Sequence, residues 1–132
     1  MIAKSITNIR SVSQVRKIID FTMLIEDFDT ARDIIENTQC IQHKHQLKSI
    51  FYTMLGNKKY NNKKINEASP FFIKALNENP ENINALFGMG VCCTCNGDYL
   101  KAETYCRDAL QIKPDFQNAE NLLNALIRAK TK

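Results

Sequence analysis

The sequence contains no tryptophan, only four glycines and only three prolines among its 132 residues. So few turn-forming residues do not suit a β-sandwich full of tight turns, and they favour long helices with short connections. No stretch approaches the roughly 20 consecutive apolar residues that cross a bilayer. The N-terminal residues also lack the apolar block that follows the basic head of a signal peptide. We therefore expect a cytoplasmic protein without a membrane span.

Sequence patterns of the common catalytic sites are also missing. The chain has neither the glycine-rich loops that hold nucleotide phosphates nor the serine elbow of α/β-hydrolases, and it lacks the paired histidines of zinc proteases. Its hydrophobic fraction of 44% and charged fraction of 24% are those of an ordinary globular domain. We therefore predict one non-catalytic domain over residues 1–132, with no cofactor.

Five cysteines are the least ordinary feature of the composition. An odd number, with Cys92, Cys93 and Cys95 crowded together, suits a reducing compartment better than a secreted disulfide scaffold. A structural zinc site needs four converging ligands, and Cys40 with His43 has a ligand-like spacing. We predict no metal site, because free cysteine packs as a small apolar residue. A metal or redox sensor built on these cysteines remains the third alternative for function.

A repeat of 34 residues runs through the second half of the chain. The segment ASPFFIKALNENP, which starts at Ala68, aligns with AETYCRDALQIKP, which starts at Ala102. Upstream, Gly56 aligns with Gly90. Further matches at the same offset pair Ala75 with Ala109, Leu76 with Leu110, and Pro80 with Pro114. Small residues recur where helices cross closely, and prolines recur where a helix must end.

These positions resemble the tetratricopeptide repeat (TPR) family, whose unit is a helix–turn–helix of 34 residues. The family pattern is matched in one unit by Tyr52, Leu55, Gly56, Ala68, Phe72, Ala75 and Pro80, and in the next by Leu86, Met89, Gly90, Ala102, Cys106, Ala109 and Pro114. The resemblance implies an all-α fold, a short right-handed α-solenoid of helix–turn–helix hairpins. It has about seven helices, of which the last is a C-terminal capping helix.

The repeat divides the domain into four parts. These are a degenerate first hairpin (1–48, with helices over 12–25 and 26–40), two full units (49–82 and 83–116) and the capping helix (117–132). One hairpin cannot bury its apolar stripe alone, so the units must stack.

Two local expectations follow from this alignment. The first unit is three residues longer than the others, and we expect His43 and His45 to lie in a solvated loop made by the extra residues. Pro70 fits only the first turn of a helix, so we expect the second helix of the middle unit to start near Asn66, a good N-cap.

The resemblance also implies a concave groove lined by the first helix of each hairpin. The family's groove positions predict a partner-binding surface of Ile50, Met54, Asn57, Tyr60, Asn61, Asn84, Phe87, Val91 and Asn118. Thr53, and Arg16 from the first unit, fall on the same positions. Some family members grip a terminal carboxylate with lysine and arginine here, and the two full units have neither. We therefore expect an extended peptide or helix, held by apolar anchors and amides.

A basic patch accounts for most of the net charge of +4: Lys58, Lys59, Lys63 and Lys64. We interpret it as a solvated turn, with a contact to an acidic partner or a membrane surface as the alternative. Nucleic acid is not favoured, because there is no stacking platform of aromatic residues. The leading hypothesis is a non-catalytic protein-binding module, an adaptor or small chaperone. The second is a self-assembling scaffold, a homo-oligomer joined through exposed end faces.

Overall fold

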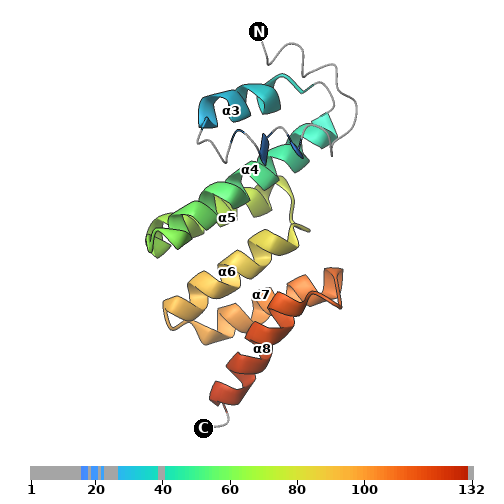
Figure 1. Ribbon diagram of the computed structural model, residues 1–132. Coiled ribbons are helices and arrows are strands. Elements are labelled where there is room, and N and C mark those ends of the chain that lie inside the picture. The colour runs from blue at the N-terminus through green and yellow to red at the C-terminus, as the bar shows by residue number, and fades with distance from the viewer. Residues whose placement is uncertain (1–15, 18, 21, 23–26, 39–40, 131–132) are drawn as a thin grey trace.

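A computed structural model of the chain describes residues 16–17, 19–20, 22, 27–38 and 41–130 (Figure 1). Six helices have complete bounds in this part: α3 (Phe28–Glu36), α4 (Ile41–Asn61), α5 (Ile65–Glu78), α6 (Ile83–Cys95), α7 (Tyr99–Ile112) and α8 (Gln117–Lys130). The predicted helix over 12–25 lies mostly outside the described residues, although those described between 16 and 22 are helical. No strand occurs in the described ranges.

The helices form a stack of hairpins with α3 at one end and α8 at the other (Figure 1). Helix α4 packs along α5, α6 packs along α7, and the contact between α5 and α6 joins the two hairpins. Helix α8 packs on α7 and also touches α6. The all-α, TPR-like arrangement predicted from the repeat is confirmed. Among the described helices, none is long and apolar enough to cross a membrane.

Side-chain caps fix where three of the helices begin. Asp27, Asn82 and Asp98 each precede a helix and accept a hydrogen bond from a backbone N–H in its first turn. Such caps satisfy donors that have no partner inside the helix. Between α5 and α6, Pro80 therefore follows the end of one helix and Asn82 starts the next.

The predicted loop around His43 and His45 is wrong. Both residues lie in α4, which begins at Ile41, and the extra residues lengthen this helix to 21 residues. No glycine or proline interrupts the segment, and contacts with both neighbouring helices stabilise it. His45 pairs with Glu78 of α5, and the Lys44 Nζ lies 3.2 Å from a carboxylate oxygen of Glu36 in α3.

The predicted start of α5 is also displaced. The helix begins at Ile65, its N-cap is Lys64 without a side-chain hydrogen bond, and Asn66 lies inside it. Pro70 consequently sits in the second turn. Because proline has no N–H, the carbonyl of Asn66 loses its helical donor, and the exposed position of Asn66 lets water replace that donor.

Each turn inside the two full hairpins contains one residue in the left-handed conformation, at equivalent positions of the repeat. These residues are Lys63 between α4 and α5, with φ of 64°, and Gly97 between α6 and α7, with φ of 81°. Glycine adopts this conformation freely, whereas a residue with a Cβ pays roughly 1–2 kcal/mol. Both hairpins therefore have the same left-handed turn residue position, although one of them carries lysine there instead of glycine.

Phe72 of α5 is the side chain around which the two hairpins meet. It is 1% exposed and lies against Gly56 of α4 and Gly88 of α6. A Cβ added to either glycine would come within 2.7 or 2.6 Å of the Phe72 ring. In the next unit Cys106 replaces Phe72, and a Cβ on Gly90 would stand 3.4 Å from its sulfur.

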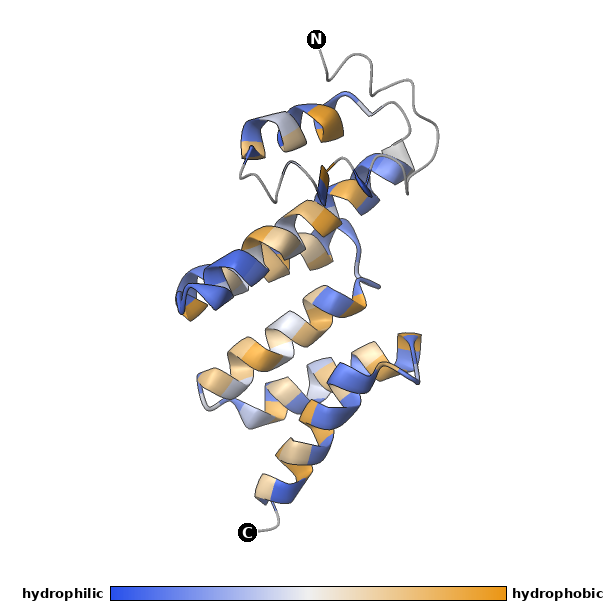
Figure 2. Ribbon diagram, viewed as in Figure 1, coloured by the Kyte–Doolittle hydropathy of each residue, from blue (hydrophilic) through white to orange (hydrophobic). Residues whose placement is uncertain are grey.

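Helix α6 is the most enclosed helix of the stack. Figure 2 shows that it is hydrophobic along most of its length, whereas the C-terminal end of α4 is hydrophilic. Its buried residues spread over more than half of its circumference because α5, α7 and α8 each cover part of its surface. This explains why α6, alone of the described helices, carries buried cysteines at two adjacent positions, Cys92 and Cys93.

We predict that Gly56→Ala and Gly90→Ala have opposite consequences. Alanine at position 56 must displace the buried Phe72 ring, which costs about 1–3 kcal/mol and outweighs its better helix propensity. Alanine at position 90 meets only ordinary contacts and gains up to about 1 kcal/mol. Urea unfolding followed by circular dichroism measures both. Equal stabilities of the two variants would contradict the role assigned to Phe72.

Candidate functional site

A pocket of about 560 Å³ runs across α4, α6 and the start of α8. These are the first helix of each full hairpin and the capping helix. The lining residues are Arg16, Gln46, Ile50, Thr53, Met54, Asn57, Asn79, Glu81, Asn82, Ile83, Asn84, Phe87 and Asn118. We call this pocket the groove.

Equivalent residues of successive repeats form a row across the groove. Ile50 of α4, Asn84 of α6 and Asn118 of α8 are each 34 positions apart and all line it. Ile50 is half-buried, while Asn84 and Asn118 are exposed. The repeat therefore presents one side chain per helix at regular intervals, which suits a ligand that extends along the stack.

The amides of the groove fall into two groups. Asn57, Asn84 and Asn118 are exposed, and their side chains have no hydrogen-bond partner within the described part of the chain. Asn79 and Asn82 instead bond to the protein itself. An amide offers both donors and an acceptor, so the first group can pair with the backbone of a ligand whatever its sequence.

Asn82 joins the two hairpins through a buried to partly buried hydrogen-bond network. Its side-chain nitrogen donates to the hydroxyls of Ser49 (2.7 Å) and Thr53 (3.0 Å) in α4. Its side-chain oxygen accepts from the backbone N–H of Ala85, which caps α6. Ser49, fully buried, in turn donates to the carbonyl of Ala75 in α5 at 2.8 Å. Helices α4, α5 and α6 are thus linked at one point beneath the groove.

Apolar side chains line the groove between the exposed amides. Ile50, Met54 and Phe87 are each half-buried. The Phe87 ring packs edge-on against Phe116, with ring centroids 5.9 Å apart, so part of its surface belongs to the core. Ile50 belongs to none of the core clusters and is the apolar residue most available to a ligand.

The groove carries almost no net charge. Of the described residues that line it, Arg16 is the cation and Glu81 the anion. The Arg16 Nε lies 3.8 Å from a carboxylate oxygen of Asp20, which weakens its field further. A cluster of cations that could hold a terminal carboxylate is therefore missing from the described lining.

Most of the predicted groove residues line the pocket, and three do not. Tyr60, Asn61 and Val91 lie outside it. Tyr60 and Asn61 belong to the C-terminal turn of α4, where Tyr60 lies beside Cys95 of α6 and burial raises the pKa of its phenol. Ligand binding by the residues that do line the groove stays a prediction.

Sequence reasoning missed five residues of the lining, which come from the start of α4 and from the connection between hairpins: Gln46, Asn79, Glu81, Asn82 and Ile83. Pro80 marked this connection as the point where the chain turns from α5 into α6. The family positions on which the prediction relied cover only the helices.

The predicted basic patch is partly neutralised. Lys59 and Lys64 both lie within 4.0 Å of a carboxylate oxygen of Glu67. The Lys58 ammonium sits 5.0 Å from the centre of the Phe28 ring, and Lys63 occupies the left-handed turn position. Attraction of an acidic partner or membrane to these lysines stays a prediction.

The described cysteines are free thiols spread over two helices. Cys92, Cys93 and Cys106 are buried and Cys95 is exposed. Burial raises the pKa of both Cys92 and Cys106 to about 11, so both stay protonated at neutral pH. No group of three metal-ligating side chains comes together within the described ranges. Cys40 of the considered ligand set lies outside them.

Comparison with known proteins identifies the fold. No protein-family model matches the sequence, and no curated protein matches it. Among solved structures, the first TPR domain of Spaghetti (RPAP3), bound to the HSP90 peptide SRMEEVD, is similar over 92% of this chain and 94% of its own, with a TM-score of 0.65 and 14% identity.

Two further structures are similar in the same way. MamA aligns over 92% of this chain and 69% of its own, with a TM-score of 0.63 and 20% identity. The C-terminal TPR-containing domain of a Plasmodium falciparum FK506-binding protein aligns over 98% and 96%, with a TM-score of 0.66 and 14% identity. At these identities the likeness shows the fold: the chain has a TPR-like fold.

We predict that Asn82→Ala lowers the free energy of unfolding by about 2 kcal/mol. The change removes a helix cap, worth about 1 kcal/mol, and two hydrogen bonds that join the hairpins. Asp98→Ala is the matched control, because the Asp98 side chain caps α7 through one 3.4 Å bond and has no bond to another described helix. Thermal unfolding measures both. A loss at Asn82 no larger than at Asp98 would contradict the linking role.

We predict that iodoacetamide modifies Cys95 well before Cys92 and Cys106 in the folded protein. The thiolate is the reactive form, and a raised pKa leaves little of it at pH 8. Time-resolved alkylation with peptide mass spectrometry reads each cysteine separately. Unfolding in urea should make all three react at similar rates. Early reaction of Cys106 in the folded state would contradict its burial.

Proposed function

We propose that this protein is a non-catalytic protein-binding module, an adaptor or small chaperone that holds an extended segment of a partner in the groove. The observation that supports it most is the row of exposed amides, without hydrogen-bond partners among the described residues, beside half-buried apolar residues across α4, α6 and α8. Hydrogen bonds from the amides to a ligand backbone supply affinity, and the apolar side chains between them select anchors.

The low charge of the groove determines which segment fits. The TPR domain of Spaghetti binds the acidic peptide SRMEEVD. Here the described lining offers Arg16 already beside Asp20, together with the anionic Glu81. An internal, uncharged segment with an aliphatic or aromatic anchor fits this lining better than an acidic C-terminus. The buried free thiols suit a reducing compartment such as the cytoplasm.

We predict that peptides selected from a random display library bind the groove through Ile50 and the exposed amides. Selected peptides are synthesised with blocked ends, and their affinities are measured by calorimetry. Asn84→Ala combined with Asn118→Ala should weaken binding about thirtyfold, because two hydrogen bonds of roughly 1 kcal/mol each are lost. Ile50→Asp should weaken it at least as much.

Asn124→Ala combined with Asn77→Ala is the matched control. Both residues are exposed amides on α8 and α5 that do not line the groove. The peptide SRMEEVD should bind more weakly than the selected peptides. Equal affinity of the groove and control variants, or selection of mainly acidic C-terminal peptides, would rule out the proposed mode.

A further inference from the structure

A second pocket, of about 210 Å³, lies between α3, α4 and α5. Helix α4 lines both pockets, but with different faces. At about 100° per residue, Ile50, Met54 and Asn57 share one side of the helix. Lys48 and Tyr52, which line the second pocket, lie on the opposite side. A ligand in the second pocket therefore leaves the groove open.

The second pocket has an apolar interior with aromatic walls. Ile35 of α3 and Phe51 of α4 are 2% and 4% exposed and form its base. Tyr52 and Phe71 are half-buried and present part of each ring to the opening. Such a recess removes an apolar side chain from water, which is the main source of affinity at small anchor pockets.

Three cations and one carboxylate surround this apolar interior: Arg32, Lys48, Lys74 and Glu36. Glu36 is already engaged, because Lys44 lies 3.2 Å and Lys48 3.6 Å from its oxygens. The hydrogen bond from Lys44 holds the pKa of Glu36 below its usual value, so this carboxylate stays charged and paired.

The other two cations, Lys74 and Arg32, form no strong ion pair with a described carboxylate. Lys74 has no carboxylate partner among the described residues, and its ammonium lies 5.5 Å from the centre of the Phe71 ring and 5.8 Å from that of Tyr52. Arg32 faces Asp29 at 3.8 Å, in a pair that is exposed on both sides and so contributes little. The rim of the pocket is therefore positively charged and open to an anion.

The next repeat shows that the fold does not require these cations. Thirty-four residues on, Lys48 corresponds to Asn82, Tyr52 to Leu86 and Lys74 to Asp108. The equivalent helices α6 and α7 still form, and α7 has the limits of α5 shifted by 34 residues, yet the basic and aromatic side chains are replaced and one charge is reversed. The combination of basic and aromatic side chains is therefore found at the junction of α3, α4 and α5 and is not repeated in the next unit.

We propose that the second pocket is an independent docking site for a partner protein segment in which one aromatic or long aliphatic side chain is flanked by Asp or Glu. Its volume is below the roughly 300 Å³ at which small-molecule sites begin, and it matches a single anchoring side chain. The apolar interior takes the anchor, while Arg32 and Lys74 face the flanking carboxylates.

The test uses the blocked peptide acetyl-DEFDE-amide and the full chain, with binding followed by amide NMR shifts. Shifts that saturate and fall on α3, α4 near Lys48, and α5 near Lys74 are the expected result. The peptide with Ala for Phe, and the peptide with Lys for each acidic residue, should not bind. Absence of shifts, or shifts centred on Ile50 and Asn84, would overturn the proposal.

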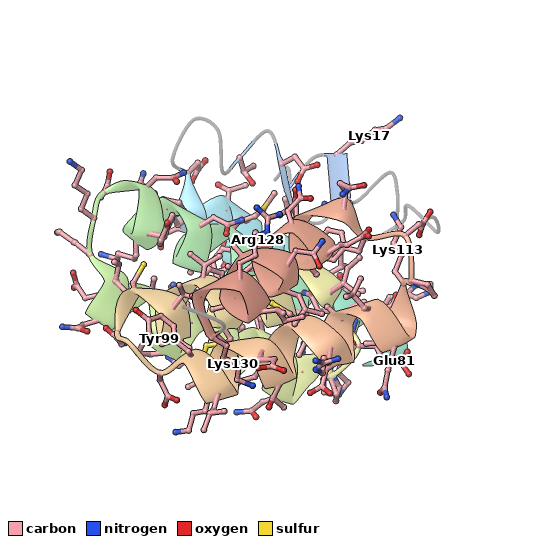
Figure 3. All side chains as sticks on the ribbon, turned by 90° about the horizontal axis from the view of Figure 1, so that it is seen from below. Lys17, Glu81, Tyr99, Lys113, Arg128 and Lys130 are labelled. Carbon is pink, nitrogen blue, oxygen red and sulfur yellow. The ribbon has the colours of Figure 1, made fainter. Side chains whose placement is uncertain are left out.

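Charge reversal of one lysine supplies the matched pair of variants. Lys74→Glu should weaken the peptide about fivefold or more, whereas Lys113→Glu should change its affinity by less than about twofold. Lys113 is exposed and follows α7, and Figure 3 places it at the end of that helix opposite Tyr99. Equal weakening by both variants would mean general electrostatic attraction and would overturn the site.

Two further measurements separate the outcomes. Unchanged thermal unfolding of Lys74→Glu shows that a loss of binding is local. If 4-hydroxyphenylacetate alone binds as tightly as the peptide, the pocket is a small-ligand site and the protein-docking proposal fails. Retained peptide binding in Ile50→Asp distinguishes this pocket from the groove, so failure of either proposal leaves the other standing.

Discussion

The close approach of α4 and α6 around Phe72 is the constraint on which the rest of the structure depends. A side chain from α5 fills the space that glycine leaves on both neighbours, so Gly56 and Gly88 fix how near the two hairpins come. Met54 lies two residues before Gly56, Phe87 directly precedes Gly88, and both line the groove. The same contact that seals the core on one side therefore sets the width of the recess on the other.

A polar contact fixes the other end of this junction. Asn82 lies six residues before Gly88, which is about 9 Å along the helix, and holds Ser49 and Thr53 of α4. Two contacts at different heights prevent one hairpin from pivoting on the other, whereas a single contact would allow it. A groove that keeps its shape without a ligand avoids part of the ordering cost of binding. Asn82 therefore lines the groove, but its hydrogen bonds stabilise the packing of the two hairpins.

Local patterns in the sequence predicted the repeat well, because the effects of glycine, alanine and proline on helix packing and helix ends depend mainly on their own positions. The limits of α5 and α7 differ by the repeat length itself. The errors came from contacts between distant residues. His45 is helical partly because Glu78 lies opposite it, and an asparagine in a connection gives no sign that Ser49, 33 residues earlier, is its partner. The family positions also placed Tyr60 and Asn61 in the groove, although the last turn of α4, to which both belong, lies outside the pocket.

Helix α4 is the one described helix that lines both pockets, and its two faces offer different chemistry. The groove is nearly neutral, so the binding proposed there, through amides and apolar contact, is hardly affected by salt. The docking proposed at the second pocket uses Lys74 and Arg32 around an apolar interior, so part of its attraction falls as salt rises. Partners drawn to the two faces therefore need not compete for charge or for space. Because α4 is anchored by Phe72 and Asn82 on its α6 side, a ligand on either face meets a helix that is already held in place.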